Sequence, residues 1–285
     1  CHSGRPGAMH WRGVLRRLRQ KGWGAMVFRR WFGQWLSGYR AMPPFPDRPV
    51  CVIGDVHGRA DLLDRMRDRI ASLDPSGRAR RILVGDLIDR GPASAEVLKT
   101  VRALSESAPD CWICLAGNHE RMMLDFLDDP VRHGLGWLMA GGDATLQSFG
   151  LSAPSGRDRG AALIALADDL AAALGAGMIT WLRGRPLLWH DGALVVSHAG
   201  IDPCRPLADQ DEAALLWGRR TGYGRHRESA GVGRVQGHVV HDRPVMRGRV
   251  IHVDTGAWSS GRLSAAWLEA GQRQPRWITV QSEDD

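Results

Sequence analysis

Three apolar runs in the first half of the chain predict buried strands, and each run leads into a helix. The runs cover residues 50–53, 82–84 and 112–116. After the first run, Leu62, Leu63, Met66 and Ile70 repeat at the spacing of one helix face, and similar repeats follow the other two runs. Strands that alternate with helices in this order predict a parallel sheet with right-handed crossovers.

The second half of the chain has an antiparallel pattern. Residues 187–190 and 193–196 flank Asp191-Gly192, which is a strong signal for a hairpin turn. Further short strands are predicted near Val235 and at 250–253 and 264–268. An Ala/Leu-rich helix is predicted at about 160–174, and residues 141–150 are predicted to be a loop or a cap element. The fold class is therefore α/β (α+β), with two sheets packed face to face and helices outside.

The pattern also divides the chain into an N-terminal arm, residues 1–49, and a main domain, residues 50–285. Residues 11–36 carry two apolar faces rich in Trp and Phe, with arginines at other positions around them, and a Pro-rich stretch ends the arm. Such a basic amphipathic element is a candidate for peripheral contact with an anionic membrane surface or with a partner groove. The alternative is a pair of helices that packs its Trp face on the main domain.

Charge and cysteine content narrow the classes of function. The net charge is +7, but residues 1–46 carry nine Arg or Lys and no Asp or Glu, leaving 29 basic and 31 acidic residues elsewhere. The main domain is therefore not basic, and no specific nucleic-acid partner is expected. Five scattered cysteines in 285 residues favour a reducing compartment. Because the chain also has no apolar run of about 20 residues, we expect a cytoplasmic location. Residues 11–36 would allow attachment at the membrane periphery.

Polar side chains follow each of the three predicted parallel strands. Asp55 and His57 follow the first strand, Asp86 the second and Asn118 the third. Residues two apart at an extended strand end point the same way, so Asp55 and His57 could reach one metal ion. One such glycine-flanked cluster could be a simple turn, but three at the same topological place favour a site.

The donor set predicts a centre of two divalent metal ions. The Asp86 carboxylate could bridge two cations, and His198 and His238 on later strands could add imidazole nitrogens. Carboxylate, amide and imidazole ligands without a thiolate suit manganese first, with iron or zinc as alternatives. Paired metals of this kind most often hydrolyse phosphate esters.

Seven short segments give the chain a resemblance to a known family. Gly54-Asp55-Val56-His57-Gly58, the run from Gly85 to Gly91, and Gly117-Asn118-His119-Glu120 resemble the signature of the phosphoprotein-phosphatase branch of the calcineurin-like metallophosphoesterases. The resemblance continues through Ser197-His198-Ala199-Gly200, Trp217-Gly218-Arg219, Gly237-His238 and Asp254-Thr255-Gly256, and so covers about residues 50–268. It implies a β-sandwich of two mixed sheets flanked by helices.

The resemblance also implies a role for each candidate residue. Asp55 and His57 would bind the first metal, Asp86 would bridge both, and Asn118, His198 and His238 would bind the second. His119 would be the general acid that protonates the leaving oxygen, and Asp89 would orient it. Arg90 and Arg219 would bind the phosphoryl oxygens together with Asn118, while Glu120 would hold the loop.

The substrate remains open between related activities. Asp89 and Glu120 favour a bacterial-type Ser/Thr protein phosphatase, which uses a water molecule activated between two metal ions to hydrolyse a phosphorylated protein or a small phosphoester. The alternative is a symmetrical bis(5'-nucleosyl) tetraphosphatase, although that group usually has Ala at the position of Asp89 and Asp at that of Glu120. A minor alternative is an inactive scaffold tethered through the arm.

Overall fold

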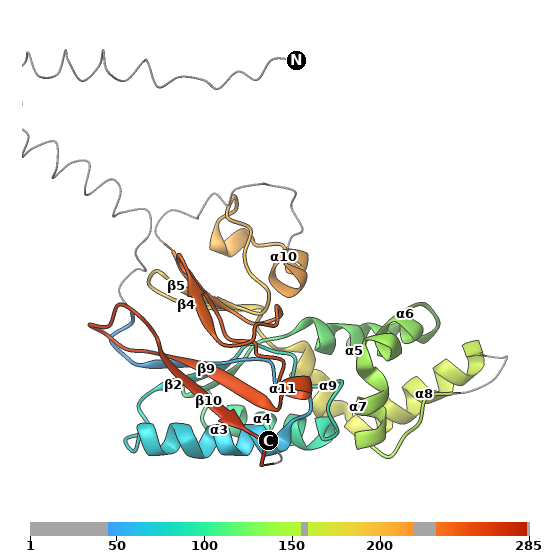
Figure 1. Ribbon diagram of the computed structural model, residues 1–285. Helices are drawn as coiled ribbons and strands as arrows, with labels where there is room; N and C mark the ends of the chain where they lie inside the picture. Colours follow the sequence, from blue (N-terminus) through green and yellow to red (C-terminus); the bar gives the residue numbers. More distant parts are fainter. Residues whose placement is uncertain (1–44, 155–158, 219–231, 284–285) are drawn as a thin grey trace, which may run out of the picture. The chain divides into compact units, whose positions relative to one another are not determined.

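The computed structural model describes residues 45–154, 159–218 and 232–283, which form two five-stranded sheets with helices around them (Figure 1). All of these residues belong to one compact unit, Met42–Asp285. Residues 11–36 and Arg219 lie outside the described residues. The contact through the arm and the role of Arg219 therefore stay predictions, as does the domain boundary at residue 49.

The first sheet has the strand order β10-β9-β1-β2-β3. Its strands are β1 (Val50–Ile53), β2 (Arg80–Leu83), β3 (Trp112–Cys114), β9 (Arg262–Leu268) and β10 (Arg276–Gln281). The strands β1, β2 and β3 are parallel, as predicted. Because β9 and β10 add antiparallel neighbours, the sheet is mixed, and β10 was not predicted from the sequence.

The second sheet has the order β4-β5-β6-β8-β7. Its strands are β4 (Leu188–Asp191), β5 (Leu194–Ser197), β6 (Gly233–Gln236), β7 (Val245–Arg247) and β8 (Val250–His252). The predicted hairpin is present, with Asp191 opposite Leu194 across the turn. The three middle strands are parallel and both edge strands are antiparallel, so this sheet is also mixed. The three-residue strand β7 was not predicted.

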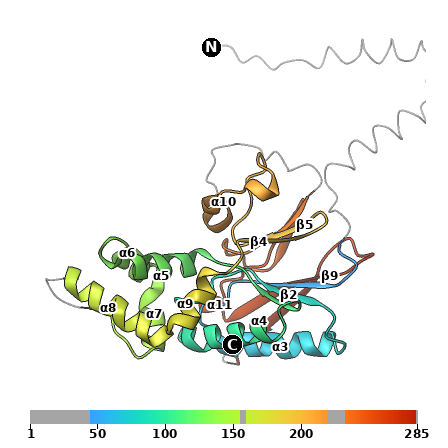
Figure 2. The same ribbon diagram turned by 180° about the vertical axis from the view of Figure 1, so that it is seen from behind.

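Helices surround the sheets and form a group of their own in the middle of the chain (Figure 2). They are α3 (Ala60–Leu73), α4 (Ser94–Ser107), α5 (Asn118–Asp128), α6 (Pro130–Trp137), η1 (Leu138–Gly142), α7 (Asp143–Ser148), α8 (Arg159–Leu174), α9 (Ala176–Arg183), α10 (Glu212–Trp217) and α11 (Ala257–Ser260), with a short 3-10 turn η2 (Leu207–Asp209). Residues 141–150, predicted as a loop or cap, are mostly helical. The chain kinks at Gly141, where φ is 112°.

The first sheet is covered by an apolar core on each face, and the strand β1 shows why. Its residues alternate, with Val50 and Val52 in the cluster between the sheets and Cys51 and Ile53 in the cluster under the helices. All four side chains are fully buried. A strand buried on both faces has a continuous apolar sequence, which is the pattern in residues 50–53. The loop that follows β1 therefore starts from a fixed point.

Within the described residues, no single helix is long and apolar enough to cross a membrane. The pair Gly160–Leu174 and Ala176–Arg183 meets the length and composition criteria together, but it bends by 93° at the break between the two helices.

Candidate metal centre and active site

The three predicted motifs meet at one edge of the first sheet because β1, β2 and β3 run in parallel. The loop after β1 is joined to the loop after β2 by backbone hydrogen bonds. The N–H groups of Val56 and His57 donate to the carbonyl of Asp86 at 3.0 and 2.9 Å, and that of Gly58 donates to Leu87 at 2.8 Å. The predicted ligands are therefore brought together by the backbone itself.

The backbone at this edge is strained. Among the described residues, the non-glycine residues with a positive φ are His57, Asp86, Asp89, Arg90 and His238. All five belong to the site predicted from the sequence. A left-handed conformation costs such a residue of order 1 kcal/mol or more, and strain of this kind gathers at functional sites. The distribution of φ angles is therefore independent support for the predicted site.

Asp86 lies at the centre of the site. Its Oδ2 is 3.6 Å from His57 Nε2, 3.4 Å from His198 Nε2 and 3.9 Å from His119 Nε2. Burial acts to raise the pKa of Asp86, but its contacts with the histidines and the N–H of His119 outweigh burial and hold the pKa below its usual range. Asp86 is therefore a carboxylate placed between two groups of candidate ligands.

The neighbouring imidazoles are oriented as metal ligands. His57 Nδ1 donates to the carbonyl of Ile88 at 2.7 Å, and His198 Nδ1 donates to the carbonyl of Val84 at 3.1 Å. A carbonyl can only accept, so each Nε2 keeps its lone pair for the centre. Burial lowers the pKa of His57 to about 3 and also lowers that of His198, which leaves both rings neutral at pH 7.

Three candidate ligand atoms converge on the second side of Asp86. Asn118 Oδ1 is 2.8 Å from His198 Nε2 and 3.0 Å from His238 Nδ1, and these two nitrogens are 3.2 Å apart. Because His198 already uses its one proton on Val84, its Nε2 faces the amide oxygen with a lone pair. Burial lowers the pKa of His238 to about 4, so that ring is neutral too. The lone pairs of His198 Nε2 and Asn118 Oδ1 meet beside this neutral ring, and such an arrangement fits a cation.

Asp55 stands slightly apart from the two histidine groups. The groups whose candidate ligand atoms all lie within 4.8 Å of one another are His57, Asp86 and His119, and Asp86, His198 and His238. The Asp55 carboxylate accepts from the N–H of His238 at 3.0 and 3.3 Å. Burial raises the pKa of Asp55 well above its usual range, and the charge of Asp254 raises it further. A cation would reverse that effect, so a metal ion bound here would favour the ionised form of Asp55.

His119 and Asp89 form the hydrogen-bonded pair that the resemblance implied. His119 Nδ1 donates to Asp89 Oδ2 at 2.7 Å. Burial acts to lower the pKa of His119, but this bond and the charge of Asp86 outweigh it and raise the pKa. Burial also raises the pKa of Asp89 despite the bonds that favour its ionised form. The pair therefore presents His119 Nε2 toward the centre.

Arg90 reaches into the same space. Its two terminal nitrogens donate to His57 Nε2 and His119 Nε2, both at 3.0 Å. A guanidinium group has no acceptor, so His119 Nε2 carries no proton while this bond exists. Protonation of His119 or metal binding by His57 would therefore require the guanidinium to move away from that nitrogen.

Glu120 joins two of the motif loops. Its Oε2 accepts from the N–H groups of Asp86 and Gly117, both at 2.9 Å, and its Oε1 accepts from that of Leu87 at 2.7 Å. Burial and the charge of Asp86 raise the pKa of Glu120 to about 7, although these N–H groups oppose the change. The side chain binds no ligand atom and sets the position of Asp86 through the backbone.

Glu120→Gln is expected to lower the free energy of unfolding by about 1–3 kcal/mol, because the amide NH₂ leaves at least one buried N–H group without an acceptor. Urea denaturation measures this change. Glu106→Gln is the control, because Glu106 is an exposed partner of Arg102 and its loss should change stability by less than about 0.5 kcal/mol. Equal stability of Glu120→Gln and the unaltered protein would show that this carboxylate does not hold the loops.

Sequence reasoning assigned no role to several residues at the site. Asp254 is buried beside Asp55, and burial raises its pKa to about 6. The sequence did contain a signal for Asp254, because this aspartate follows the strand β8 just as the aspartates of the first two motifs follow their strands. Trp137 and Thr145 bind Asp89, and Trp258 lies under the guanidinium of Arg90 with 5.3 Å from Cζ to the ring centroid. These aromatic and hydroxyl residues come from distant segments and carry no local signal.

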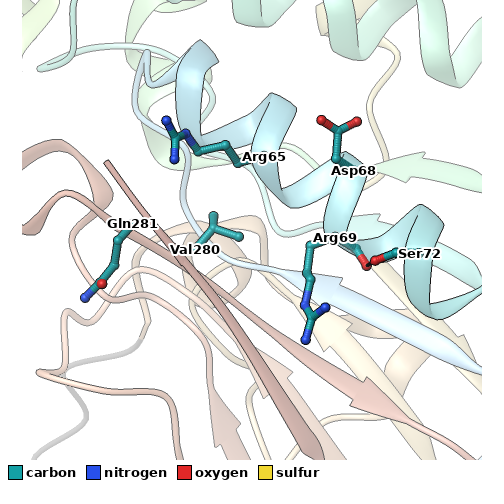
Figure 3. A pocket seen from close by; sticks show the side chains of 6 residues that line it. All are labelled: Arg65, Asp68, Arg69, Ser72, Val280 and Gln281. Carbon is teal, nitrogen blue, oxygen red and sulfur yellow. Dashed lines mark hydrogen bonds between the residues drawn. The ribbon is translucent and has the colours of Figure 1, made fainter. Parts of the chain in front are cut away.

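A shallow hollow lies elsewhere, between α3 and β10 (Figure 3). It is lined by Arg65, Asp68, Arg69, Ser72, Val280 and Gln281. None of these residues belongs to the strand-end motifs, and Arg65 already pairs with Glu283. This hollow is therefore separate from the candidate metal centre.

Known proteins share both the sequence pattern and the fold. The model of the calcineurin-like phosphoesterase family matches residues 48–217. A symmetrical bis(5'-nucleosyl)-tetraphosphatase from Aromatoleum aromaticum (strain DSM 19018 / LMG 30748 / EbN1) is 33% identical over 176 residues, which cover 58% of this chain and 51% of that protein. The asymmetrical bis(5'-nucleosyl)-tetraphosphatase PrpE from Geobacillus thermodenitrificans (strain NG80-2) is 27% identical over 258 residues, covering 81% of this chain and 92% of that protein.

The chain spans about half the length of the symmetrical tetraphosphatases that it matches. A solved structure provisionally assigned as a diadenosine tetraphosphatase superposes with a TM-score of 0.58 and 20% identity, covering 87% of this chain and all of that one. At this identity the superposition shows the fold alone. The family model covers more than half of the chain, from the strand before the first motif to α10, and on this ground the chain belongs to the calcineurin-like phosphoesterase family.

Proposed function

We propose that the chain hydrolyses phosphoesters with the help of two divalent cations, for which manganese is our first candidate. The proposal rests on the position of the Asp86 carboxylate between two sets of imidazole nitrogens. Its Oδ2 is 3.6 Å from His57 Nε2 and 3.4 Å from His198 Nε2. Calcineurin-like phosphoesterases use divalent metals, and this donor set fits them. Asp55 and His57 would hold one ion, Asp86 would lie on both, and Asn118, His198 and His238 would hold the other.

When bound, the two cations would lower the pKa of a water molecule and stabilise charge on the phosphoryl oxygens. The chain supplies the remaining functions. Arg90 would bind the phosphoryl oxygens through its paired N–H groups, and Arg219 and Asn118 are proposed to assist it. His119, oriented by Asp89, would donate a proton from Nε2 to the leaving oxygen.

We propose a dinucleoside tetraphosphate as the substrate. Both relatives described above are named as bis(5'-nucleosyl)-tetraphosphatases, one symmetrical and one asymmetrical. Exposed apolar side chains around the site also favour a substrate with flat apolar groups. Trp258 is 43% exposed beside Arg90, and Val239 and Val240, which directly follow His238, are 46% and 52% exposed. An indole and two aliphatic side chains next to a phosphate site suit a nucleobase, which binds by stacking and apolar contact.

The His119–Asp89 pair favours a second candidate, hydrolysis of a phosphoserine or phosphothreonine ester. Cleavage within a polyphosphate chain expels a phosphate group, which is stable as an anion and gains little from a proton donor. Cleavage of a serine phosphate expels an alkoxide, which needs a proton during the reaction. An intact proton-donor pair, with 2.7 Å between Nδ1 and Oδ2, therefore fits a phosphomonoester better.

A direct comparison of substrates tests the proposal. The full chain with Mn²⁺ would be given diadenosine tetraphosphate or a phosphoserine peptide at matched enzyme concentration, and the products would be separated and quantified by liquid chromatography. We expect kcat/KM to be at least about tenfold higher for the dinucleotide, and Asp86→Asn protein controls for contaminating phosphatases. A preference for the peptide would overturn the dinucleotide in favour of the second candidate. Hydrolysis of neither compound, nor of an aryl phosphate, would refute phosphoester hydrolysis itself.

A further inference from the structure

The carboxylate of Asp89 has more hydrogen-bond donors than the orientation of one histidine needs. Besides His119, Trp137 Nε1 donates to Oδ2 at 3.0 Å and to Oδ1 at 3.2 Å, and Thr145 Oγ1 donates to Oδ1 at 2.6 Å. Asp89 is completely buried, and Trp137 and Thr145 are buried with it. Both oxygens of the carboxylate are therefore fixed by protein groups.

The hydroxyl of Thr145 holds the backbone of Asp89 as well as its side chain. Thr145 Oγ1 accepts from the N–H of Asp89 at 2.9 Å, and Ser94 Oγ accepts from the same N–H at 3.1 Å. A hydroxyl has one proton to donate. The shortest contact of the Thr145 hydroxyl is 2.6 Å, to the Asp89 carboxylate, and we place the proton in that hydrogen bond. Thr145 therefore fixes Asp89 at two points, its carboxylate and its backbone N–H. The backbone of Asp89 is strained, with a φ of 72°.

Trp137 connects this carboxylate to the helix that carries His119. Its indole stacks on Phe126 of α5, with 4.9 Å between ring centroids and 27° between planes. Phe126 and His119 are seven residues apart and so lie on the same face of α5. Gly142 allows the indole to fit, because a Cβ there would be 2.5 Å from Trp137 Cε2. Segment 137–145 thus sets the position of Asp89 relative to α5.

We propose that Trp137 and Thr145 are positioning residues for proton delivery, holding Asp89 and through it the His119 ring so that Nε2 points at the leaving oxygen. The inference rests on the proposed function of His119 and extends the site to α6 and α7, far from the strand-end motifs in sequence. Arg90 is tied to the same segment, because its N–H donates to the carbonyl of Gly141 at 3.1 Å. The segment therefore contacts both Asp89, which orients the proposed proton donor, and the arginine proposed to bind phosphate.

A positioning role and a purely structural role differ in how the leaving group affects the rate. Loss of proton delivery slows an ester with an alkoxide leaving group and hardly affects p-nitrophenyl phosphate, whose leaving phenolate is stable without a proton. General loss of structure slows both esters equally. The ratio of the two rates therefore reports on His119 and is insensitive to the fraction of folded protein.

The test uses Trp137→Phe, which keeps a ring on Phe126 and removes the N–H, and Thr145→Val, which keeps the shape and removes the hydroxyl. Trp181→Phe is the matched control, because Trp181 is a buried indole whose Nε1 donates to Ser105 Oγ at 3.1 Å outside the site. Thr145→Ser restores the hydroxyl. Each full-length protein is loaded with Mn²⁺ and assayed with an alkyl phosphate and with p-nitrophenyl phosphate.

We expect kcat on the alkyl ester to fall at least about tenfold in Trp137→Phe and Thr145→Val, and kcat on p-nitrophenyl phosphate to change less than about twofold. Trp181→Phe should match the unaltered protein, and Thr145→Ser should recover most of the alkyl-ester rate. Equal losses on both esters, or no loss on either, would overturn the proposal.

A second measurement separates this inference from the proposed function. In the Zn²⁺-loaded protein, which is diamagnetic, ¹H NMR can observe the Nδ1 proton of His119, assigned by its absence in His119→Gln. Its resonance should shift in Trp137→Phe and Thr145→Val and stay unchanged in Trp181→Phe. An unchanged resonance in the first two variants would refute positioning, whereas absence of hydrolysis by the unaltered protein would refute only the proposed activity.

Discussion

Asp86→Asn is expected to reduce metal-dependent hydrolysis of any phosphoester by about 10³-fold or more, because it removes the one carboxylate placed on both sides of the centre. Asparagine has one carbonyl oxygen and no negative charge, so it cannot serve two cations. Its NH₂ group would also occupy coordination space near the lone pairs of His57 and His198. Initial rates with p-nitrophenyl phosphate and Mn²⁺ measure the effect.

The same variant should still fold. Asp86 Oδ1 accepts from the N–H of His119 at 3.0 Å, and an amide oxygen can accept that bond as well. Asp74→Asn is the control, because Asp74 is a buried carboxylate outside the site that pairs with Arg81 at 2.9 Å. We expect Asp74→Asn to be less stable but active when folded. Substantial activity of Asp86→Asn would contradict a shared carboxylate.

His119→Gln is expected to show the second large effect, and the size of that effect should depend on the leaving group. Hydrolysis of an alkyl phosphate should fall by about 10²–10⁴-fold, the usual contribution of a general acid. Hydrolysis of p-nitrophenyl phosphate should fall much less. Glutamine cannot donate a mobile proton, although it can keep a hydrogen bond to Asp89. A series of aryl and alkyl phosphates measures the dependence of log kcat on the leaving-group pKa.

The result also bears on the natural substrate. If the variant keeps its rate on diadenosine tetraphosphate and loses its rate on phosphoserine peptide, the proton donor serves monoesters and the dinucleotide reaction does not need it. Equal losses on all substrates would contradict the role of His119 as an acid. They would instead fit His119 as a metal ligand, because its Nε2 lies 3.9 Å from Asp86.

The sequence predicted the parts of the fold that depend on local pattern. The continuous apolar run at residues 50–53 became β1, and Asp191-Gly192 marked the β4–β5 hairpin. The strand β10 was missed because its edge position leaves most of its side chains exposed, with Ile278 buried, so the apolar signal is weak. The strand β7 was missed because three residues are too short to show a period.

In the site too, the residues with a local sequence pattern could be predicted and the others could not. Asp55, Asp86 and Asn118 could be found because each follows a buried strand, and the parallel order of β1, β2 and β3 brings them together. Trp137 and Thr145 could not be found, since a buried tryptophan and threonine in helices look like ordinary core residues. Their contact with Asp89 depends on the packing of α6 on α5 and of α7 on α4. Residues 141–150 gave no helical signal in the sequence, and the chain kinks there at Gly141.

Metal binding tests the central claim most directly. The metal-free full-length chain would be titrated with Mn²⁺ in an isothermal calorimeter, beside Asp86→Asn and Asp74→Asn. We predict that the unaltered chain and Asp74→Asn bind two ions per chain, and that Asp86→Asn binds at most one. Two ions bound by Asp86→Asn with unchanged affinity, or none bound by the unaltered chain, would contradict the account.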